Sequence, residues 1–177
     1  MHAKYAKGVT LVELMVVIAV VAILAVAAMP SYRELLDRYK VGKAAEDVVS
    51  LISNARSGSV KLHRQVAVSF ATDEDWCVGA NAAATPTGGA RAGAASACSC
   101  DSPSTCLVDG ENLVIPVGKH PGVTLTSVGG NIVFDGLVGA TTGLATQAAT
   151  LESPEGLFTA TVNVTPLGQA NITVIEN

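Results

Sequence analysis

The hydrophobic pattern of the chain changes period twice. Sixteen apolar residues follow one another without a break from Leu14 to Met29. Beyond Pro30, apolar residues recur at spacings of three and four, at Val41, Ala45, Val48, Ile52 and Ala55. This spacing is typical of one face of an amphipathic α-helix. We therefore predict one long helix from about Thr10 to His63, with a kink at Pro30.

From Gln65 onward apolar and polar residues alternate in short runs, which is the period of a half-buried β-strand. Clusters of Gly, Pro, Asn and Asp separate the runs and predict tight turns. A helix followed by strands indicates an α+β fold with an antiparallel β-sheet head. The predicted strands are Val66–Phe70, Trp76–Gly79, Leu113–Val117, Val123–Val128, Asn131–Phe134, Thr150–Glu152, Phe158–Val164 and Asn171–Ile175.

The apolar segment has the length of a membrane span. Residues 9–29 cover 21 positions, interrupted only by Thr10 and Glu13. As a helix they would extend roughly 30 Å, the thickness of the hydrocarbon core of a bilayer. Lys4 and Lys7 precede the segment and favour a cytoplasmic N-terminus. We expect a single-pass membrane protein in which everything after Met29 faces outward.

Glu13 is unusual in such a segment, because an ionised carboxylate in hydrocarbon costs a few kcal/mol unless it has a partner. Its surroundings, Gly8-Val9-Thr10-Leu11-Val12-Glu13-Leu14-Met15-Val16-Val17, resemble the prepilin signature of type IV pilins and type II secretion pseudopilins. The resemblance implies that a prepilin peptidase cuts after Gly8 and that Val9 becomes the methylated N-terminus. It also implies that Glu13 pairs with the N-terminal amine of a neighbouring subunit. The family usually has Phe where this chain has Val9.

Two other interpretations of the N-terminus stay open at this point. An uncleaved anchor explains the apolar run and the lysines but not Glu13. A secretory signal peptide could be cut at the A-x-A pattern Ala25-Val26-Ala27. The prepilin interpretation divides the chain into a leader at 1–8, a transmembrane and assembly helix at 9–29, its amphipathic continuation at 30–64 and a β-rich head at 65–177.

Four cysteines, at positions 77, 98, 100 and 106, lie within thirty residues of the head. An even number on an exported chain predicts disulfides. We favour Cys77–Cys98 with Cys100–Cys106, slightly over Cys77–Cys100 with Cys98–Cys106. A zinc site is disfavoured, because the spacing is C-x-C and the histidines are remote in sequence. The cysteines tether a loop at 77–106, whose stretch 79–97 is rich in Ala, Gly, Ser and Thr and predicts a mobile surface loop.

Charge is divided unevenly along the chain. The net charge is −4, but residues 31–65 carry seven basic against four acidic residues, and residues 66–177 carry two against ten. The head is therefore acidic, which disfavours DNA as a partner.

A second resemblance covers the head. Asn54-Ala55-Arg56-Ser57, Trp76-Cys77-Val78-Gly79, Ile132-Val133-Phe134-Asp135-Gly136 and Pro166-Leu167-Gly168 are similar to the GspH/FimT branch of minor pilins and pseudopilins. Some members of this branch bind DNA through a Gly-Arg-x-Arg element near the C-terminus. Here the matching residues are Gly168-Gln169-Ala170-Asn171, and both arginines are absent.

No motif for catalysis or phosphate binding occurs in the sequence. The acidic clusters Asp73-Glu74-Asp75 and Asp109-Gly110-Glu111 each supply too few oxygens for calcium and are interpreted as solvated turns. Trp76 is expected to pack in the core. We therefore expect a structural filament subunit without catalytic residues, metal or cofactor. Its expected partners are other pilin or pseudopilin subunits, prepilin peptidase and the inner membrane. The alternatives are an H-type pseudopilin in protein export and a DNA-uptake pilin.

Overall fold

The computed structural model describes residues 8–72, 75–85, 94–99, 102–143 and 147–177. Helix α1 (Leu11–Leu62) comes first, and short strands follow it. The predicted order of one long helix and then an antiparallel head is confirmed, and each end of α1 lies within one residue of the predicted end. The chain divides into two compact units, Met1–Leu36 and Asp37–Asn177.

The part of α1 in the second unit carries the core of the head. The predicted apolar stripe is fully buried, since Val41, Ala45, Val48, Ile52 and Ala55 have no exposed surface. Each of these residues packs in one hydrophobic cluster with the strands. The period of three and four therefore identified the buried face of the helix correctly.

The C-terminal end of α1 is closed by backbone hydrogen bonds. His63 adopts the left-handed conformation, with φ of 50°. Its N–H donates to the Val60 carbonyl, and the Arg64 N–H donates to the Ser59 carbonyl, which is the Schellman pattern. A side chain at Gly136 would overlap the backbone of His63 and Arg64. Glycine at this position therefore lets the following strand region pass close to the helix end.

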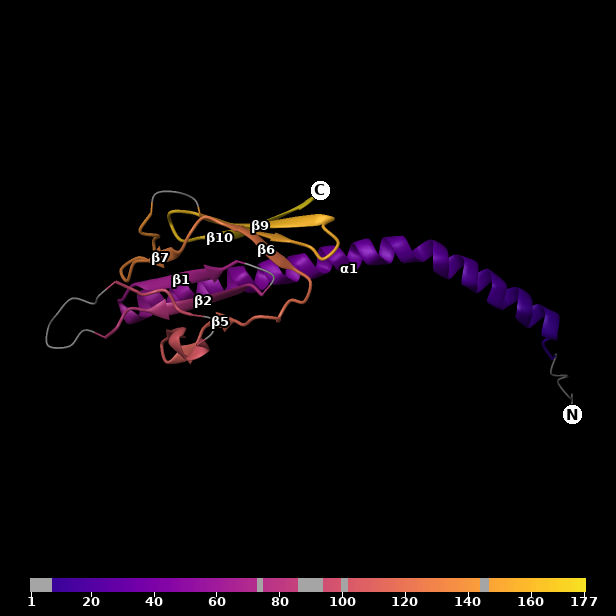
Figure 1. Cartoon of the computed structure of the whole chain (residues 1–177), viewed down its shortest axis with the longest axis horizontal. Helices are drawn as coiled ribbons and strands as arrows, with labels where there is room; N and C mark the ends of the chain where they lie inside the picture. The colour runs from indigo at the N-terminus through magenta and orange to yellow at the C-terminus, as the bar shows by residue number, and fades with distance from the viewer. Residues whose placement is uncertain (1–7, 73–74, 86–93, 100–101, 144–146) are drawn as a thin grey trace, which may run out of the picture. The chain divides into compact units, whose positions relative to one another are not determined.

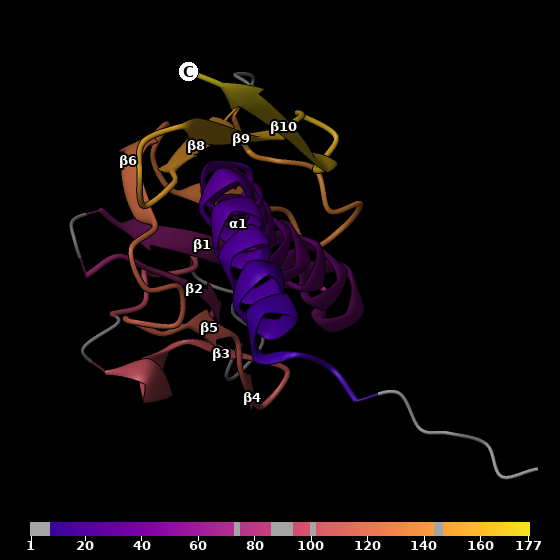
Figure 2. The ribbon, with the colours of Figure 1, turned by 90° about the vertical axis from the view of Figure 1, so that its right-hand side faces the viewer.

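Two four-stranded antiparallel sheets pack on this part of α1 (Figures 1 and 2). The first has the order β5-β2-β1-β7, formed by Val114–Ile115, Cys77–Ala82, Val66–Ala71 and Ile132–Phe134. The second has the order β10-β9-β8-β6, formed by Ala170–Glu176, Phe158–Val164, Gln147–Glu152 and Thr124–Val128. A separate small hairpin joins β3 (Leu107–Val108) to β4 (Glu111–Asn112), and the short helix η1 (Pro103–Thr105) precedes it.

In the second sheet, buried residues alternate with partly exposed ones along the strand. In β9 the residues Phe158, Ala160, Val162 and Val164 are at most 5% exposed, and the intervening residues are half-buried. The predicted strand Phe158–Val164 matches β9 at both ends.

Several strand and loop bounds predicted for the head need correction. The predicted loop at 79–97 begins too early, because its first four residues belong to β2 and pair with Val66–Ser69 of β1. The predicted strand Leu113–Val117 shortens to the two residues of β5. The β3–β4 hairpin was not predicted, although Asp109 and Gly110 form its turn with φ of 57° and 82°. The turn predicted within Asp109-Gly110-Glu111 is present, and an Asp-Gly pair between two strands is a recognised hairpin signal.

The first unit contains the N-terminal part of α1. Most large apolar side chains from Val9 to Met29 are at least half exposed, and the most exposed is Leu11 at 75%. Among the described helices, no single one is long and apolar enough to span a membrane. The segments Leu11–Val26 and Ser31–Leu62, taken together as one bent pair, meet the requirement by length and composition only.

Candidate processing and assembly site

The residues around the predicted cleavage point form an exposed lead into α1. Gly8, Val9 and Thr10 precede the helix and are exposed. The Thr10 hydroxyl oxygen accepts the Glu13 N–H at 3.2 Å, and the Thr10 carbonyl accepts the Leu14 N–H at 3.2 Å. Thr10 is therefore the N-cap of α1, and the predicted scissile bond between Gly8 and Val9 lies in non-helical, accessible backbone.

Gly8 has no structural requirement for glycine within the described residues. A Cβ atom added at this position would meet no heavy atom within 4 Å. Any need for glycine here would therefore come from an enzyme that binds the segment, not from the fold of the chain.

Glu13 lies in the first turn of α1, on a helix whose other nearby side chains are apolar. Within the described residues its carboxylate forms no ion pair and no side-chain hydrogen bond. A negative charge in the first turn interacts favourably with the helix dipole, but that interaction is worth only about 0.3–1 kcal/mol. Among the described residues, therefore, none supplies a cationic partner for this carboxylate.

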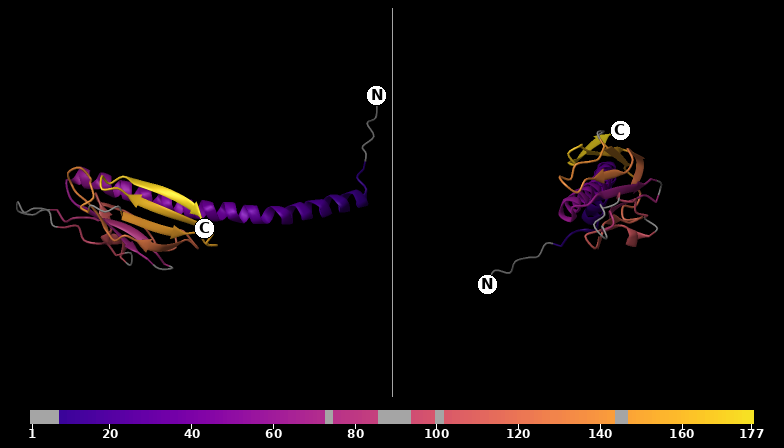
Figure 3. Two further views of the ribbon diagram at one scale, coloured as in Figure 1. Left: turned by 90° about the horizontal axis from the view of Figure 1, so that it is seen from above. Right: turned by 90° about the vertical axis from the view of Figure 1, so that its left-hand side faces the viewer.

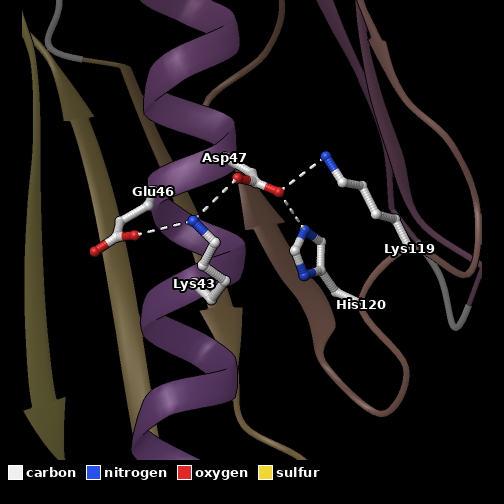
Figure 4. A network of polar contacts seen from close by, with 5 residues as sticks. All are labelled: Lys43, Glu46, Asp47, Lys119 and His120. Carbon is white, nitrogen blue, oxygen red and sulfur yellow. Dashed lines mark hydrogen bonds and ion pairs between the residues drawn. The ribbon is translucent and has the colours of Figure 1, made fainter.

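A polar network links α1 to the loop before β6 in the head (Figure 4). Oδ2 of Asp47 lies 2.9 Å from Lys119 Nζ and 3.1 Å from His120 Nε2. Lys43 Nζ lies 3.7 Å from Asp47 Oδ1 and 3.4 Å from Glu46 Oε2. Burial raises the pKa of Asp47, but the hydrogen bond to Lys119 and the charges of Lys119, His120 and Lys43 together outweigh burial and hold the pKa below its ordinary value.

Trp76 completes this region, and its predicted core position is confirmed because it is 4% exposed. Its indole N–H donates to the Val123 carbonyl at 2.7 Å, and its ring stacks on His120. Burial lowers the pKa of His120 despite the opposing charge of Asp47. Sequence analysis missed the network because Asp47 and His120 are 73 residues apart. Its geometry is that of a structural link between helix and loop.

Known proteins resemble both parts of the chain. Residues 3–29 match the prokaryotic N-terminal methylation motif. The fold matches the type IV minor pilin FimU of Pseudomonas aeruginosa (strain PAO1) with a TM-score of 0.51, at 12% identity over 78% of this chain and 92% of that chain. The chain is prepilin-like in motif and in fold. A second crystal form of FimU gives a TM-score of 0.47, at 12% identity over 75% and 91% of the two chains. A comparison with curated proteins gives no match.

The cysteines of this prepilin-like chain correct the favoured disulfide pattern. Cys98 is bonded to Cys106, so neither Cys77–Cys98 nor Cys100–Cys106 can form as well. Cys77 is also disulfide-bonded. Cys100 lies outside the described residues, and its pairing with Cys77 stays a prediction from the second of the two sequence patterns.

The disulfide packs directly on a glycine of β2. A Cβ atom at Gly79 would overlap the sulfurs of both Cys98 and Cys106. The Cys98 N–H donates to the Ser69 hydroxyl at 3.3 Å, which fixes the bridge against β1. The missing side chain at Gly79 makes room for the Cys98–Cys106 bridge above the first sheet, a packing relationship that sequence spacing does not reveal.

Residues 168–171, where the sequence lacks the two arginines, line a groove in the prepilin-like head. The groove has a volume of about 430 Å³ and is lined by Ser53, Arg56, Ser57, Thr165 and residues 168–171. Arg56 supplies the only formal charge among these lining residues, and its Nε–H donates to the Gly139 carbonyl at 3.0 Å. Gln169 and Asn171 contribute neutral amides to the groove.

No group of three or more His, Cys, Asp or Glu side chains suited to a metal ion occurs in the described ranges. His63 ends α1, and His120 is committed to Asp47 and Trp76, so the two histidines have separate structural roles.

Proposed function

We propose that the chain is a minor subunit of a type IV pilus-like filament, processed after Gly8 and polymerised through α1. The observation that carries the proposal is the methylation motif at residues 3–29, which coincides with an exposed apolar helix on a chain of pilin fold. Prepilin peptidase would remove the leader at 1–8 and the methylated amine would then belong to Val9.

The exposed apolar side chains of the first unit support an assembly role. A continuous apolar surface of this kind needs cover, because apolar surface is unfavourable in water. The inner membrane would cover it before assembly, with the head in the periplasm, and the helices of neighbouring subunits would cover it in the filament.

Glu13 would favour assembly over the free subunit. A charged side chain at the centre of a membrane helix costs about 2.5–3.5 kcal/mol on insertion scales, and Glu13, in the first turn of α1, carries a smaller cost of the same kind. The N-terminal amine of a neighbouring Val9 would offset that cost by pairing with Glu13. Because the pair forms only between subunits, it favours the polymer over the membrane-bound monomer.

The head would determine which subunits the chain contacts, and we propose no catalytic role for it. A pilus minor pilin is our first assignment. An H-type pseudopilin of a type II secretion system is the alternative, since the same processing motif and head pattern serve both. Genes for minor pilins or for secretion components beside the coding sequence would distinguish these two assignments.

DNA uptake is a weaker proposal. Residues 66–177 carry two basic against ten acidic residues, and phosphate contacts supply most non-specific affinity for DNA. The groove at Arg56 offers a single guanidinium to phosphate groups, and its Nε–H already donates a hydrogen bond to the Gly139 carbonyl.

The filament assignment can be tested by co-expressing the full chain with a pilus assembly system and immunoblotting sheared filaments. We expect the processed chain in the filament fraction. Its presence only in the membrane fraction, with assembly otherwise normal, would contradict the proposal.

A further inference from the structure

The strand edges of the head differ in how they are protected from pairing with other chains. Strands β5 and β7, at the edges of the first sheet, have only two and three residues. Strand β6, at one edge of the second sheet, has a register shift between Leu125 and Ser127. Short strands and bulges are common ways to prevent edge pairing. Strand β10, at the opposite edge, has neither protection.

Strand β10 is long and regular. Its seven residues pair with β9 without interruption, from Ala170 opposite Val164 to Glu176 opposite Phe158. The strand contains no proline and no basic residue, and its only charge is at Glu176. In an antiparallel edge strand, alternate residues direct their N–H and C=O groups away from the sheet. β10, the yellow strand near the C-terminus in Figure 3, lies at an edge of its sheet. It therefore offers an unprotected row of backbone donors and acceptors.

The core side of β10 is also incompletely covered. Ile172 lies opposite Val162 and Val174 lies opposite Ala160, so these four residues share one face of the sheet. Val162 and Ala160 are at most 1% exposed, whereas Ile172 and Val174 are only partly buried. One more strand beside β10 would cover them in the way that β10 covers its neighbours in β9.

Space for such a strand begins beside α1. The groove of about 430 Å³ lies between Ser53, Arg56 and Ser57 of α1 and the first residues of β10, Ala170 and Asn171. Arg56 lines the groove, and in the described part of the chain its two terminal nitrogens form no hydrogen bond. They can bind a carboxylate or backbone carbonyls at one end of an incoming strand.

We infer that β10 pairs with an extended strand of a neighbouring filament subunit, one end of which lies in the groove between α1 and the first residues of β10. The inference rests on the proposed filament role. The incoming strand would place apolar side chains over Ile172 and Val174 and an acidic residue or its carbonyls at Arg56. Main-chain hydrogen bonds would supply affinity, and the apolar and acidic positions would select the partner.

A different subunit fits this edge better than a second copy of the chain. Two copies would pair β10 with β10 about a two-fold axis, because the other described edges are short or irregular. A two-fold contact closes after two chains, whereas a filament needs contacts between unlike surfaces.

Hydrogen exchange with mass spectrometry on the full chain tests the inference directly. The C-terminal peptide containing β10 is compared between detergent-solubilised subunits and sheared filaments. We expect about three amides to gain protection in filaments, because every second N–H of β10 is free in the subunit. The peptide that covers β6 serves as the internal control and should show no such gain.

The possible results separate the inference from the proposed function. Filaments that contain the chain without added protection in β10 would overturn the inference alone. Filaments without the chain would overturn the proposed function and the inference with it. Added protection in detergent together with a dimer in analytical ultracentrifugation would show that a second copy occupies the edge, and would also overturn the inference.

A variant pair provides a second test. Val174→Lys places an inward-pointing charge on the edge strand, which is a known way to prevent pairing. We expect at least a tenfold lower filament fraction for this variant. Thr161→Lys, on the outer face of β9, adds the same charge one strand away from the edge and should leave the fraction unchanged. Equal incorporation of both variants would contradict the inference. If Val174→Lys fails to fold, the exchange experiment on the unmodified chain still tests the inference.

Discussion

The ring of Trp76 stacks on the imidazole of His120, with centroids 5.8 Å apart and planes 4° from parallel. The contact holds the loop before β6 against the residue that precedes β2, and Asp47 holds the same imidazole against α1. Lys119 and Lys43 share the Asp47 carboxylate, so the charged groups around His120 come from both the helix and the loop (Figure 4).

This stack predicts a loss of stability in mild acid. Because burial lowers the pKa of His120, the unfolded chain binds a proton at this position more readily than the folded chain. Stability should be constant above about pH 7 and decrease as the pH falls through the ordinary histidine pKa of about 6.5. The pKa of Asp47 is lowered too, so its contribution to stability persists until far more acidic pH.

Thermal unfolding of the chain between pH 7.5 and 5.5 measures the effect. The midpoint should fall with acidification, and His120→Gln should flatten that dependence. His63→Asn is the matched control, because it removes an exposed histidine and Asn tolerates the left-handed conformation at this position. An unchanged pH dependence in His120→Gln would show that His120 is not the source of the loss of stability in mild acid.

The disulfide between Cys98 and Cys106 gives a prediction of stability. Replacing both cysteines with Ser should lower the free energy of unfolding by about 2.5 kcal/mol, the loop-closure entropy expected for a bridge across eight positions. Denaturant titration measures the loss, and mass-spectrometric mapping of the oxidised chain should find Cys98 linked to Cys106. A Cys77–Cys98 linkage would contradict the structure.

Glu13 gives a prediction of assembly. Glu13→Ala should be processed and inserted into the membrane but be missing from filaments, because its pairing with a neighbouring N-terminal amine is lost. Insertion should be undiminished, since a costly charge has been removed. Glu34→Ala is the control, because Glu34 is an exposed acid on the same helix beyond the apolar run. Normal incorporation of Glu13→Ala would show that the carboxylate has no role in assembly.

The head gives a prediction about DNA. The chain in detergent should bind DNA weakly in a mobility-shift assay, and binding should disappear as salt rises. Gln169→Arg with Asn171→Arg should strengthen binding, since the two charges would join Arg56 at one groove. Thr126→Arg with Thr161→Arg adds equal charge elsewhere and should have a smaller effect. Submicromolar binding by the unmodified chain at near-physiological salt would favour DNA uptake instead.

Regular elements with one buried face were predictable from the sequence. The stripe from Val41 to Ala55 and the alternation in β9 are visible because burial repeats with the period of the backbone. Thr10 also marks the start of α1 as a hydroxyl residue ahead of an apolar run.

Features that depend on tertiary contact were not predictable. The Asp47–His120 contact joins residues 73 positions apart, and no local period records it. The Cys98–Cys106 bridge packs against Gly79, where a side chain would overlap both sulfurs, and sequence spacing does not record this contact. The loop prediction failed at Gly79–Ala82 because small residues resemble a linker in composition, whereas pairing with β1 makes them a strand.

Cleavage after Gly8 is the measurement that tests the central claim most directly. The full chain is co-expressed with a prepilin peptidase, and the mass and N-terminal sequence of the product are determined. We predict a product that begins at Val9, and no cleavage in a Gly8→Val variant, whose fold has room for the added side chain. A mature chain that begins at Ala28, or normal cleavage of Gly8→Val, would contradict the account.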